Sequence, residues 1–182
     1  MGDYPEPGVL PQFIHPWTMY GPGQDIRLQA NTSSPAAFTW VANTAFYIPI
    51  TLPWPYPVNR VFWVNGSTVA SANCDFGIYT AASLTKIYST GSTTQSGASV
   101  PQYVTPTTPF ILDAGNYYFA WACDSTTSHA FALAITTAAQ GSMIGLYSQA
   151  TAFPLPATAT LASIGTTLGV PLCGITRTPT GF

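Results

Sequence analysis

The order of apolar and polar positions along the chain predicts β-strands throughout. The clearest strand covers residues 117–123 and follows an Asp-Ala-Gly-Asn turn at residues 113–116. Because side chains alternate across a strand, one face carries large aromatic rings and the other mostly methyl groups. The aromatic face holds Tyr117, Phe119, Trp121 and Cys123, and the small face holds Tyr118, Ala120 and Ala122. A neighbouring layer can therefore approach the small face closely.

The sequence predicts a hairpin that packs beside this strand. Residues 74–79 form a strand, and residues 86–89 form its hairpin partner across a tip at residues 81–84. We expect the strands at 74–79 and 117–123 to form the antiparallel centre of a sandwich. Other strands are expected where β-branched and aromatic residues gather, at residues 38–41, 45–52, 60–64, 130–135 and 170–175, with proline-limited edge strands at 103–104 and 110–112.

Turn and loop signals separate these strands at short intervals. Asn65-Gly66 is a strong hairpin signal, residues 53–57 (Pro-Trp-Pro-Tyr-Pro) predict a rigid polyproline-like loop, and residues 90–99 predict a polar surface loop. Many short strands at this spacing are typical of sandwiches. The predicted fold class is all-β, an antiparallel β-sandwich or jelly roll that covers residues 38–182.

Residues 1–37 have a different character and predict an extended, proline-rich N-terminal arm. Five prolines between positions 5 and 22 oppose a helix or a central strand, while apolar residues such as Trp17 and Tyr20 are unusual in a free linker. Such an arm lies against a surface. It either wraps its own domain or docks onto a neighbouring subunit or another protein.

Charge is the composition's most unusual feature. Only 5% of the 182 residues are charged, against about 25% in typical soluble domains, and 47% are hydrophobic. The outside must therefore consist of small polar and apolar groups, which favours a protein that covers much of its surface with copies of itself or with a larger assembly. A neutral secreted domain rich in Thr and Ser is the alternative interpretation.

The net charge of −2, with four Lys and Arg residues, argues against nucleic acid as a partner. The apolar runs are too short and too interrupted for insertion into a membrane. The first residues lack the basic and apolar regions of a secretion signal, so any export would use another route.

Three cysteines, Cys74, Cys123 and Cys173, lie about fifty residues apart, unlike the short paired spacings of zinc sites. We expect buried, free thiols. A Cys74–Cys123 disulfide requires that their two strands be neighbours, and no sign of an oxidising compartment supports one.

The residues offer no catalytic constellation, and we expect a non-enzymatic protein without a cofactor or a metal. Asp113 and Asp124 lie at opposite ends of one predicted strand, too far apart to act as a glycosidase pair. His15 and His129 have no nearby pattern of a triad or a metal cluster.

Aromatic side chains are the most abundant groups that could contact a ligand or a partner. Trp17 and Tyr20 in the arm, with Trp54 and Tyr56 in the proline loop, are candidate contacts for a partner or a sugar ring. Equally, they can fill interfaces between subunits of an assembly.

Several stretches, taken in order, resemble a family of small virion proteins of tailed bacteriophages. They are Val-Phe-Trp-Val-Asn-Gly at residues 61–66, Asp-Phe-Gly-Ile-Tyr at 75–79, the Ser/Thr/Gly segment at 89–97, Asp-Ala-Gly-Asn-Tyr-Tyr-Phe-Ala at 113–120, and Ala-Phe-Pro-Leu-Pro-Ala-Thr at 152–158. The likeness covers roughly residues 58–160 and leaves out the arm.

The resemblance implies a structural β-sandwich on the exterior of a phage particle, as a head decoration, a head fibre or a tail component. On this hypothesis the domain forms a homo-oligomer, expected to be a trimer, and the arm anchors it to capsid or tail proteins. The alternative function is a receptor-binding module for host surface glycans, using Trp54, Tyr56 or the loops near Thr93 and Asp124.

Overall fold

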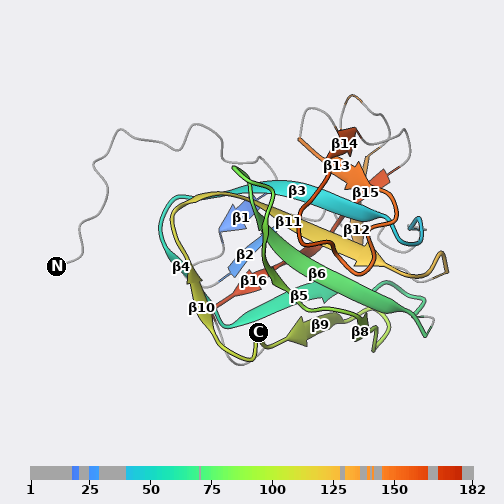
Figure 1. Cartoon of the computed structure of the whole chain (residues 1–182). Helices are drawn as coiled ribbons and strands as arrows, with labels where there is room; N and C mark the ends of the chain where they lie inside the picture. Colours follow the sequence, from blue (N-terminus) through green and yellow to red (C-terminus); the bar gives the residue numbers. More distant parts are fainter. Residues whose placement is uncertain are drawn as a thin grey trace.

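A computed structural model describes residues 18–20, 25–28, 40–69, 71–127, 130–135, 139, 141, 145–163 and 168–177. It is an all-β structure in which antiparallel sheets pack together as a sandwich (Figure 1). The candidate contact Trp17 and both histidines, His15 and His129, lie outside the described residues.

The larger sheet contains the predicted central unit. Its path is β14 (Ala162–Ser163), β13 (Tyr147–Gln149), β3 (Ala45–Leu52), β11 (Gly115–Cys123), β6 (Asn73–Thr80) and β7 (Lys86–Ser89), and β8 (Thr93–Thr94) also pairs with β6. The antiparallel pairing of β11 with β6 and the β6–β7 hairpin are as predicted. β3 lies on the other side of β11, which makes β11 a central strand.

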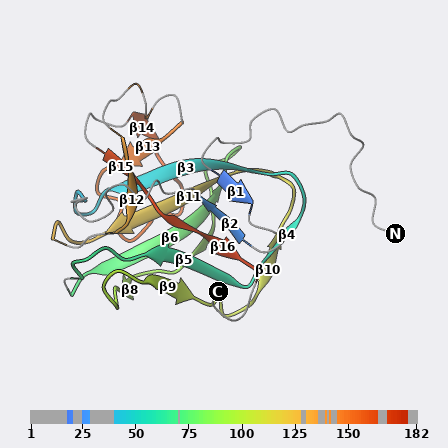
Figure 2. The ribbon, with the colours of Figure 1, turned by 180° about the vertical axis from the view of Figure 1, so that it is seen from behind.

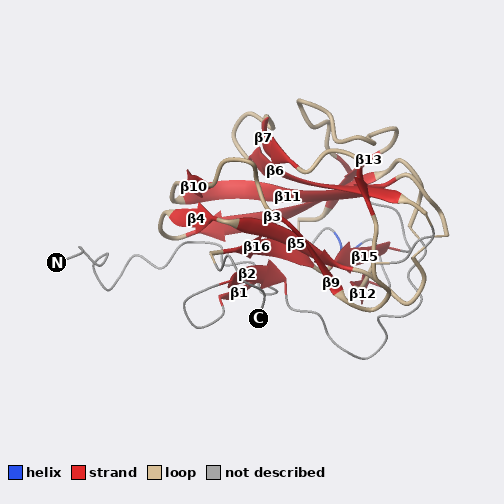
Figure 3. Ribbon diagram, turned by 90° about the horizontal axis from the view of Figure 1, so that it is seen from below, coloured by secondary structure: helices blue, strands red, loops and turns tan. Residues whose placement is uncertain are grey.

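The second sheet forms the opposite layer, seen from behind in Figure 2 and in profile in Figure 3. Its order is β1 (Thr18–Tyr20), β2 (Asp25–Leu28), β16 (Cys173–Thr176), β5 (Arg60–Val64) and β9 (Pro101–Val104). β1 and β2 fall within the predicted arm, and their backbones extend this sheet through β16. This part of the arm region lies on its own domain.

Two short ribbons complete the fold. One joins β4 (Tyr56–Val58) to β10 (Phe110–Leu112), and the other joins β12 (Ala132–Ile135) to β15 (Leu168–Pro171). β4 lies between β3 and β5 in the chain, and β10 lies between β9 and β11. The β4–β10 ribbon therefore lies where the chain crosses from one sheet to the other.

The core lies between the sheets, and the face alternation predicted for residues 117–123 is confirmed. Phe119, Trp121 and Cys123 join the main buried cluster, with Tyr117 packed against it. The small residues of the opposite face join a second cluster on the outer side of the larger sheet. Burial of this many large side chains is the main stabilising contribution to the sandwich.

Four local predictions need correction. Trp40 and Val41 are not in a strand, and the predicted proline loop ends early because Tyr56 already begins β4. The predicted late strand at 170–175 is two strands, β15 and β16, which break at Leu172 and join different partners. Asn65-Gly66 does not form a hairpin, because β5 and β6 belong to different sheets.

Candidate functional site

Asp75, Asp113 and Asp124, whose side chains the structure describes, lie in three separate surroundings. Asp113 is exposed in the turn before β11, and Asp124 follows the last residue of that strand. The Asp124 carboxylate accepts hydrogen bonds from the backbone N–H and the side-chain amide of Asn73, at 2.8 and 2.9 Å. Asp75 is buried in β6. The two ends of β11 keep Asp113 and Asp124 apart, so they do not form a carboxylate pair.

The two candidate contacts in the proline loop differ in exposure. Trp54 is 47% exposed, whereas Tyr56 is 3% exposed and belongs to the main core. The Arg177 guanidinium lies 5.4 Å from the centre of the Tyr56 ring. Tyr56 is therefore a core residue of the folded chain and cannot serve as the surface contact that we expected from the sequence.

The β4–β10 ribbon, which begins two residues after Trp54 in the chain, carries another exposed apolar side chain. Ile111 is 66% exposed and stands opposite Pro57 in the β4–β10 ribbon. Since alternate residues face outward, Pro57 and Ile111 share the outer face of this ribbon, with Trp54 three residues before Pro57. We call Trp54, Pro57 and Ile111 the apolar ribbon face. Tyr20, the other candidate in the described residues, ends β1, of which the structure describes only the backbone.

A shallow groove of about 440 Å³ lies beside the end of β11. Its lining is mostly small and polar, from Ala42, Ser71, Ala72, Asp124, Ser125 and Thr126. This groove includes the Asp124 loop that was a candidate glycan contact. The Asp124 carboxylate is already engaged by Asn73, so hydroxyl groups of Ser and Thr provide the remaining polar atoms.

The most elaborate polar constellation holds one segment across the outer face of the larger sheet. We call residues 152–161 the strap, which is the orange segment that crosses in front of the sheet in Figure 1. The buried Asp75 carboxylate accepts hydrogen bonds from the Leu155 backbone N–H at 2.9 Å, from the Ser89 hydroxyl at 2.7 Å and from the Thr90 hydroxyl at 3.2 Å. One carboxylate thus joins β6, β7 and the strap.

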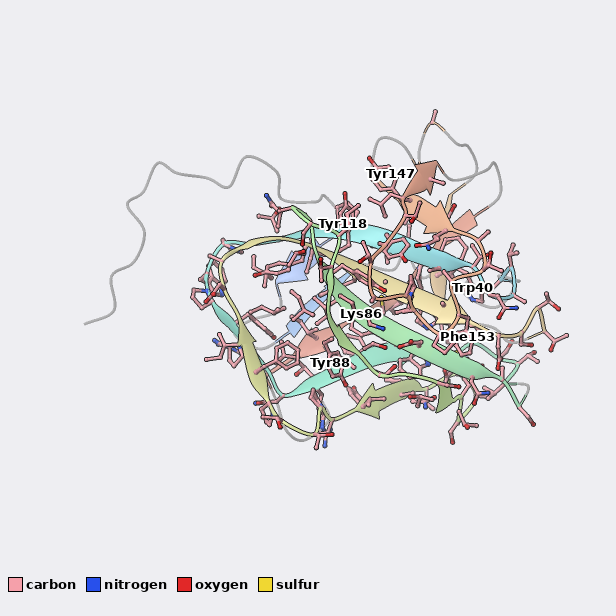
Figure 4. All side chains as sticks on the ribbon, viewed as in Figure 1. Trp40, Lys86, Tyr88, Tyr118, Tyr147 and Phe153 are labelled. Atoms are coloured by element: carbon pink, nitrogen blue, oxygen red, sulfur yellow. The ribbon has the colours of Figure 1, made fainter. Side chains whose placement is uncertain are left out.

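Further hydrogen bonds fix the strap on both sides of Leu155. The Lys86 ammonium donates to the Leu155 carbonyl, and the Tyr79 hydroxyl donates to the Pro156 carbonyl, both at 2.6 Å. Backbone bonds join Lys86 to Ala157 and Ala159 to Leu84. Figure 4 shows Lys86 and Phe153 on this side of the sheet. The strap is therefore a built-in layer of the fold.

The strap covers a second apolar cluster. Tyr47 and Tyr79 meet edge to face with ring centres 5.4 Å apart, and Ala120, Ala122 and Leu155 pack around them. The Tyr47 hydroxyl donates to Gln149 at 2.8 Å, and burial raises the pKa of Tyr47 to about 12. The small face of β11 is thus where a layer approaches closely, as the sequence predicted.

Gly77 sets how closely the strap can approach. A Cβ at this position would lie 2.7 Å from Leu155 Cδ1 and 3.2 Å from the Tyr88 carbonyl oxygen. We expect Gly77→Ala to destabilise the fold by about 1–2 kcal/mol, because Leu155 must move out of its packed position. Thermal unfolding would measure this loss, with the exposed Ala82→Gly as a control for backbone effects. An unchanged melting temperature for Gly77→Ala would contradict close packing of the strap.

A second buried polar network surrounds Asn65, at the end of β5. Its carbonyl oxygen accepts hydrogen bonds from the Trp63 indole at 2.8 Å and from the Gln95 amide at 2.9 Å. Its amide donates to the carbonyls of Ser96 and Gly97, and to the Gln102 side chain. Residues 90–99, predicted as a polar surface loop, contain β8, which pairs with β6, and Asn65 holds the turn that follows at Ser96 and Gly97.

Sequence reasoning missed Asp75 and Asn65 as organising residues. Asp75 was weighed only as a conceivable catalytic carboxylate together with Asp113 and Asp124, although a charged residue inside an apolar strand signals a buried set of partners. Asn65 was hidden by the following glycine, which indicated a turn.

Among the described residues, no group of three or more His, Cys, Asp or Glu side chains could hold a metal ion. Within the same part of the chain, no helix has the length and apolar character needed to cross a bilayer. No protein-family model matches the chain, and no curated protein matches it.

Proposed function

We propose that this chain is a non-enzymatic structural component of a tailed-phage particle, built on a jelly roll that assembles with copies of itself. The observation that carries the proposal is the nested strand pairing. β2 pairs with β16, β3 with β11, β5 with β9, and β6 with β7. This nesting is what a long antiparallel hairpin gives when it is rolled into two sheets, and it is the pattern of jelly rolls, which are common in viral capsids and lectins.

The surface also favours assembly. The chain carries ten charged residues, of which Asp75 is buried. Within the apolar ribbon face, Trp54 and Ile111 are exposed, and Pro57 stands opposite Ile111. Exposed aromatic residues and few charges are typical of the centre of an interface. We propose a homo-oligomer, with a trimer as the expected form, on the exterior of the particle, where it contacts capsid or tail proteins.

The solution mass of the full chain tests this proposal. We expect sedimentation analysis at micromolar concentration to give a multiple of the 19.3 kDa chain mass. A single species of chain mass across the micromolar range, together with absence of the protein from purified particles, would contradict the assembly proposal.

Trp54→Ala should weaken that self-association by about tenfold or more in Kd, because buried tryptophans often dominate interface energies. The fold should be unaffected, since the indole is half exposed. Val41→Ala is the matched control, as Val41 is 56% exposed and lies beside the Cys123 end of β11, whereas β10 leads into the opposite end of that strand. Equal effects of both variants would contradict a role for the apolar ribbon face.

A host-glycan-binding module is the second candidate, and the exposed Trp54 ring is the observation that favours it. Flat apolar rings stack on sugars, and jelly rolls also occur in lectins. A glycan array with the full chain distinguishes the two functions. Binding that Trp54→Ala abolishes while the oligomer persists would favour the glycan role over the structural one.

A further inference from the structure

The cysteine pair at the end of the central strands is unused by the proposed function. Cys74 is the second residue of β6, and Cys123 is the last residue of β11. The two stand directly opposite each other in the antiparallel register, and both are buried free thiols. The condition for a disulfide that the sequence left open, that these strands be neighbours, is therefore met.

The ladder geometry makes the pair a close one. The next residues along form a hydrogen-bonded pair, since the Asp124 N–H donates to the Asn73 carbonyl at 3.0 Å. Bonded and non-bonded pairs alternate in an antiparallel ladder, so Cys74 and Cys123 occupy a non-bonded position. The Cys123 carbonyl agrees, because it accepts from Asn43 beyond β11 instead of from β6. Cα atoms at such positions are about 4.5 Å apart, within the range that a disulfide spans.

We infer that Cys74 and Cys123 form a disulfide across β6 and β11 when a small-molecule disulfide, such as oxidised glutathione, is supplied. The inference does not depend on the proposed function. The two sulfurs already interact: the hydrogen bond between them and burial raise the pKa of the Cys74 thiol, and the same hydrogen bond lowers the pKa of the Cys123 thiol. Cys123 is therefore the thiol that loses its proton first and attacks.

The exchange balances in two steps. The Cys123 thiolate attacks one sulfur of oxidised glutathione, which forms a mixed disulfide and releases one glutathione thiol. Cys74 then gives up its proton and attacks the Cys123 sulfur, which forms the protein disulfide and releases the second glutathione. The protein loses two hydrogens, and one glutathione disulfide becomes two thiols.

The groove beside β11 gives the reagent a place to approach. Its lining includes Ala72, two residues before Cys74, and Asp124, the residue after Cys123. Opening of the strand ends at this groove, a small local fluctuation, would expose the pair without unfolding the sheet.

The test treats the full chain with oxidised glutathione and then maps peptides under non-reducing conditions. We expect a cross-linked peptide pair containing Cys74 and Cys123, and a melting temperature about 6–12 °C higher that dithiothreitol reverses. Cys173→Ala should behave like the unmodified sequence, because Cys173 is buried in β16 of the other sheet. Cys74→Ala should abolish both changes.

Measuring the unmodified chain keeps the test independent of how well a variant folds. Recovery of Cys74 and Cys123 as free thiols after prolonged oxidation of the folded protein would overturn the inference. Cross-links that involve Cys173, or no reversible shift in melting temperature despite cross-linking, would overturn it as well.

Discussion

Asp75→Ala is expected to lower the free energy of unfolding by about 3 kcal/mol or more, because the lost carboxylate leaves several buried donors without an acceptor. The Leu155 N–H and the hydroxyls of Ser89 and Thr90 all donate to this group. The Thr90 hydroxyl also accepts from the Phe76 N–H, so its position is coupled to β6 itself. Loss of Asp75 thus loosens two strands and the strap together.

Chemical denaturation of the full chain would measure this effect, and the loss corresponds to a melting temperature lower by roughly 6–12 °C. Asp113→Ala is the matched control, since that carboxylate is exposed in a turn and should cost little. Equal stabilities of the two variants would contradict the role of Asp75 as the anchor of the strap.

Asp75→Asn tests the contribution of the negative charge, because asparagine has nearly the same shape as aspartate but no charge. The amide keeps one acceptor oxygen, but its NH₂ group would face hydroxyl or backbone donors. We expect a stability between those of the original chain and Asp75→Ala. Hydrogen exchange should show faster exchange at the Leu155 N–H in both variants, because this amide bonds directly to the carboxylate.

The Asp75 anchor also brings three segments that are separate in the chain together in space. The segments at 75–79, 89–97 and 152–158 belong to β6, to the end of β7 with the loop after it, and to the strap. Asp75 contacts Ser89 and Leu155, and Gly77 lies against Leu155. The three segments therefore form one structural joint on the outer face of the larger sheet.

The central strands could be predicted from the sequence because their own side chains determine their pairing. Residues 117–123 alternate between large and small side chains, and the core and the strap cover the corresponding faces of β11. The β6–β7 hairpin is local, with a short tip between its strands. Period-two alternation and short-range turns are the features that a sequence states most directly.

The remaining elements depend on contacts between residues far apart in the chain. The break at Leu172 arises because β15 joins β12 while β16 enters the five-stranded sheet. Tyr56 was expected to be a surface contact because it lies in a proline-rich segment, but its pairing with Leu112 directs its side chain into the core. Burial at such positions follows from tertiary pairing, which overrides local preference.

The candidate site residues, too, could be predicted from the sequence only in part. Trp54 was predicted as a candidate surface contact, and its side chain is exposed. Asp75 needed knowledge of the strap, which is eighty residues away in the chain. The structural role of a buried polar group can be predicted from a sequence only when its hydrogen-bond partners are also known.

Asn65→Ala is the second large prediction, with an expected loss of about 2–4 kcal/mol in the free energy of unfolding. Asn65 is fully buried, and its carbonyl is the acceptor for the Trp63 indole and the Gln95 amide. Removing the side chain leaves both donors buried without that acceptor. It also frees the carbonyls of Ser96 and Gly97 from the amide that holds them.

The loss of protection should be confined to one part of the chain, which distinguishes it from a general loss of stability. The loop at residues 94–100 should become the preferred site of limited proteolysis in Asn65→Ala, while β6 and β11 stay protected until global unfolding. Asn116→Ala is the matched control, because that asparagine makes an exposed hydrogen bond with Thr51 and should cost well under 1 kcal/mol. Uniform protease sensitivity across Asn65→Ala, or a loss no larger than that of Asn116→Ala, would contradict the view that the Asn65 side chain fixes the turn at Ser96 and Gly97.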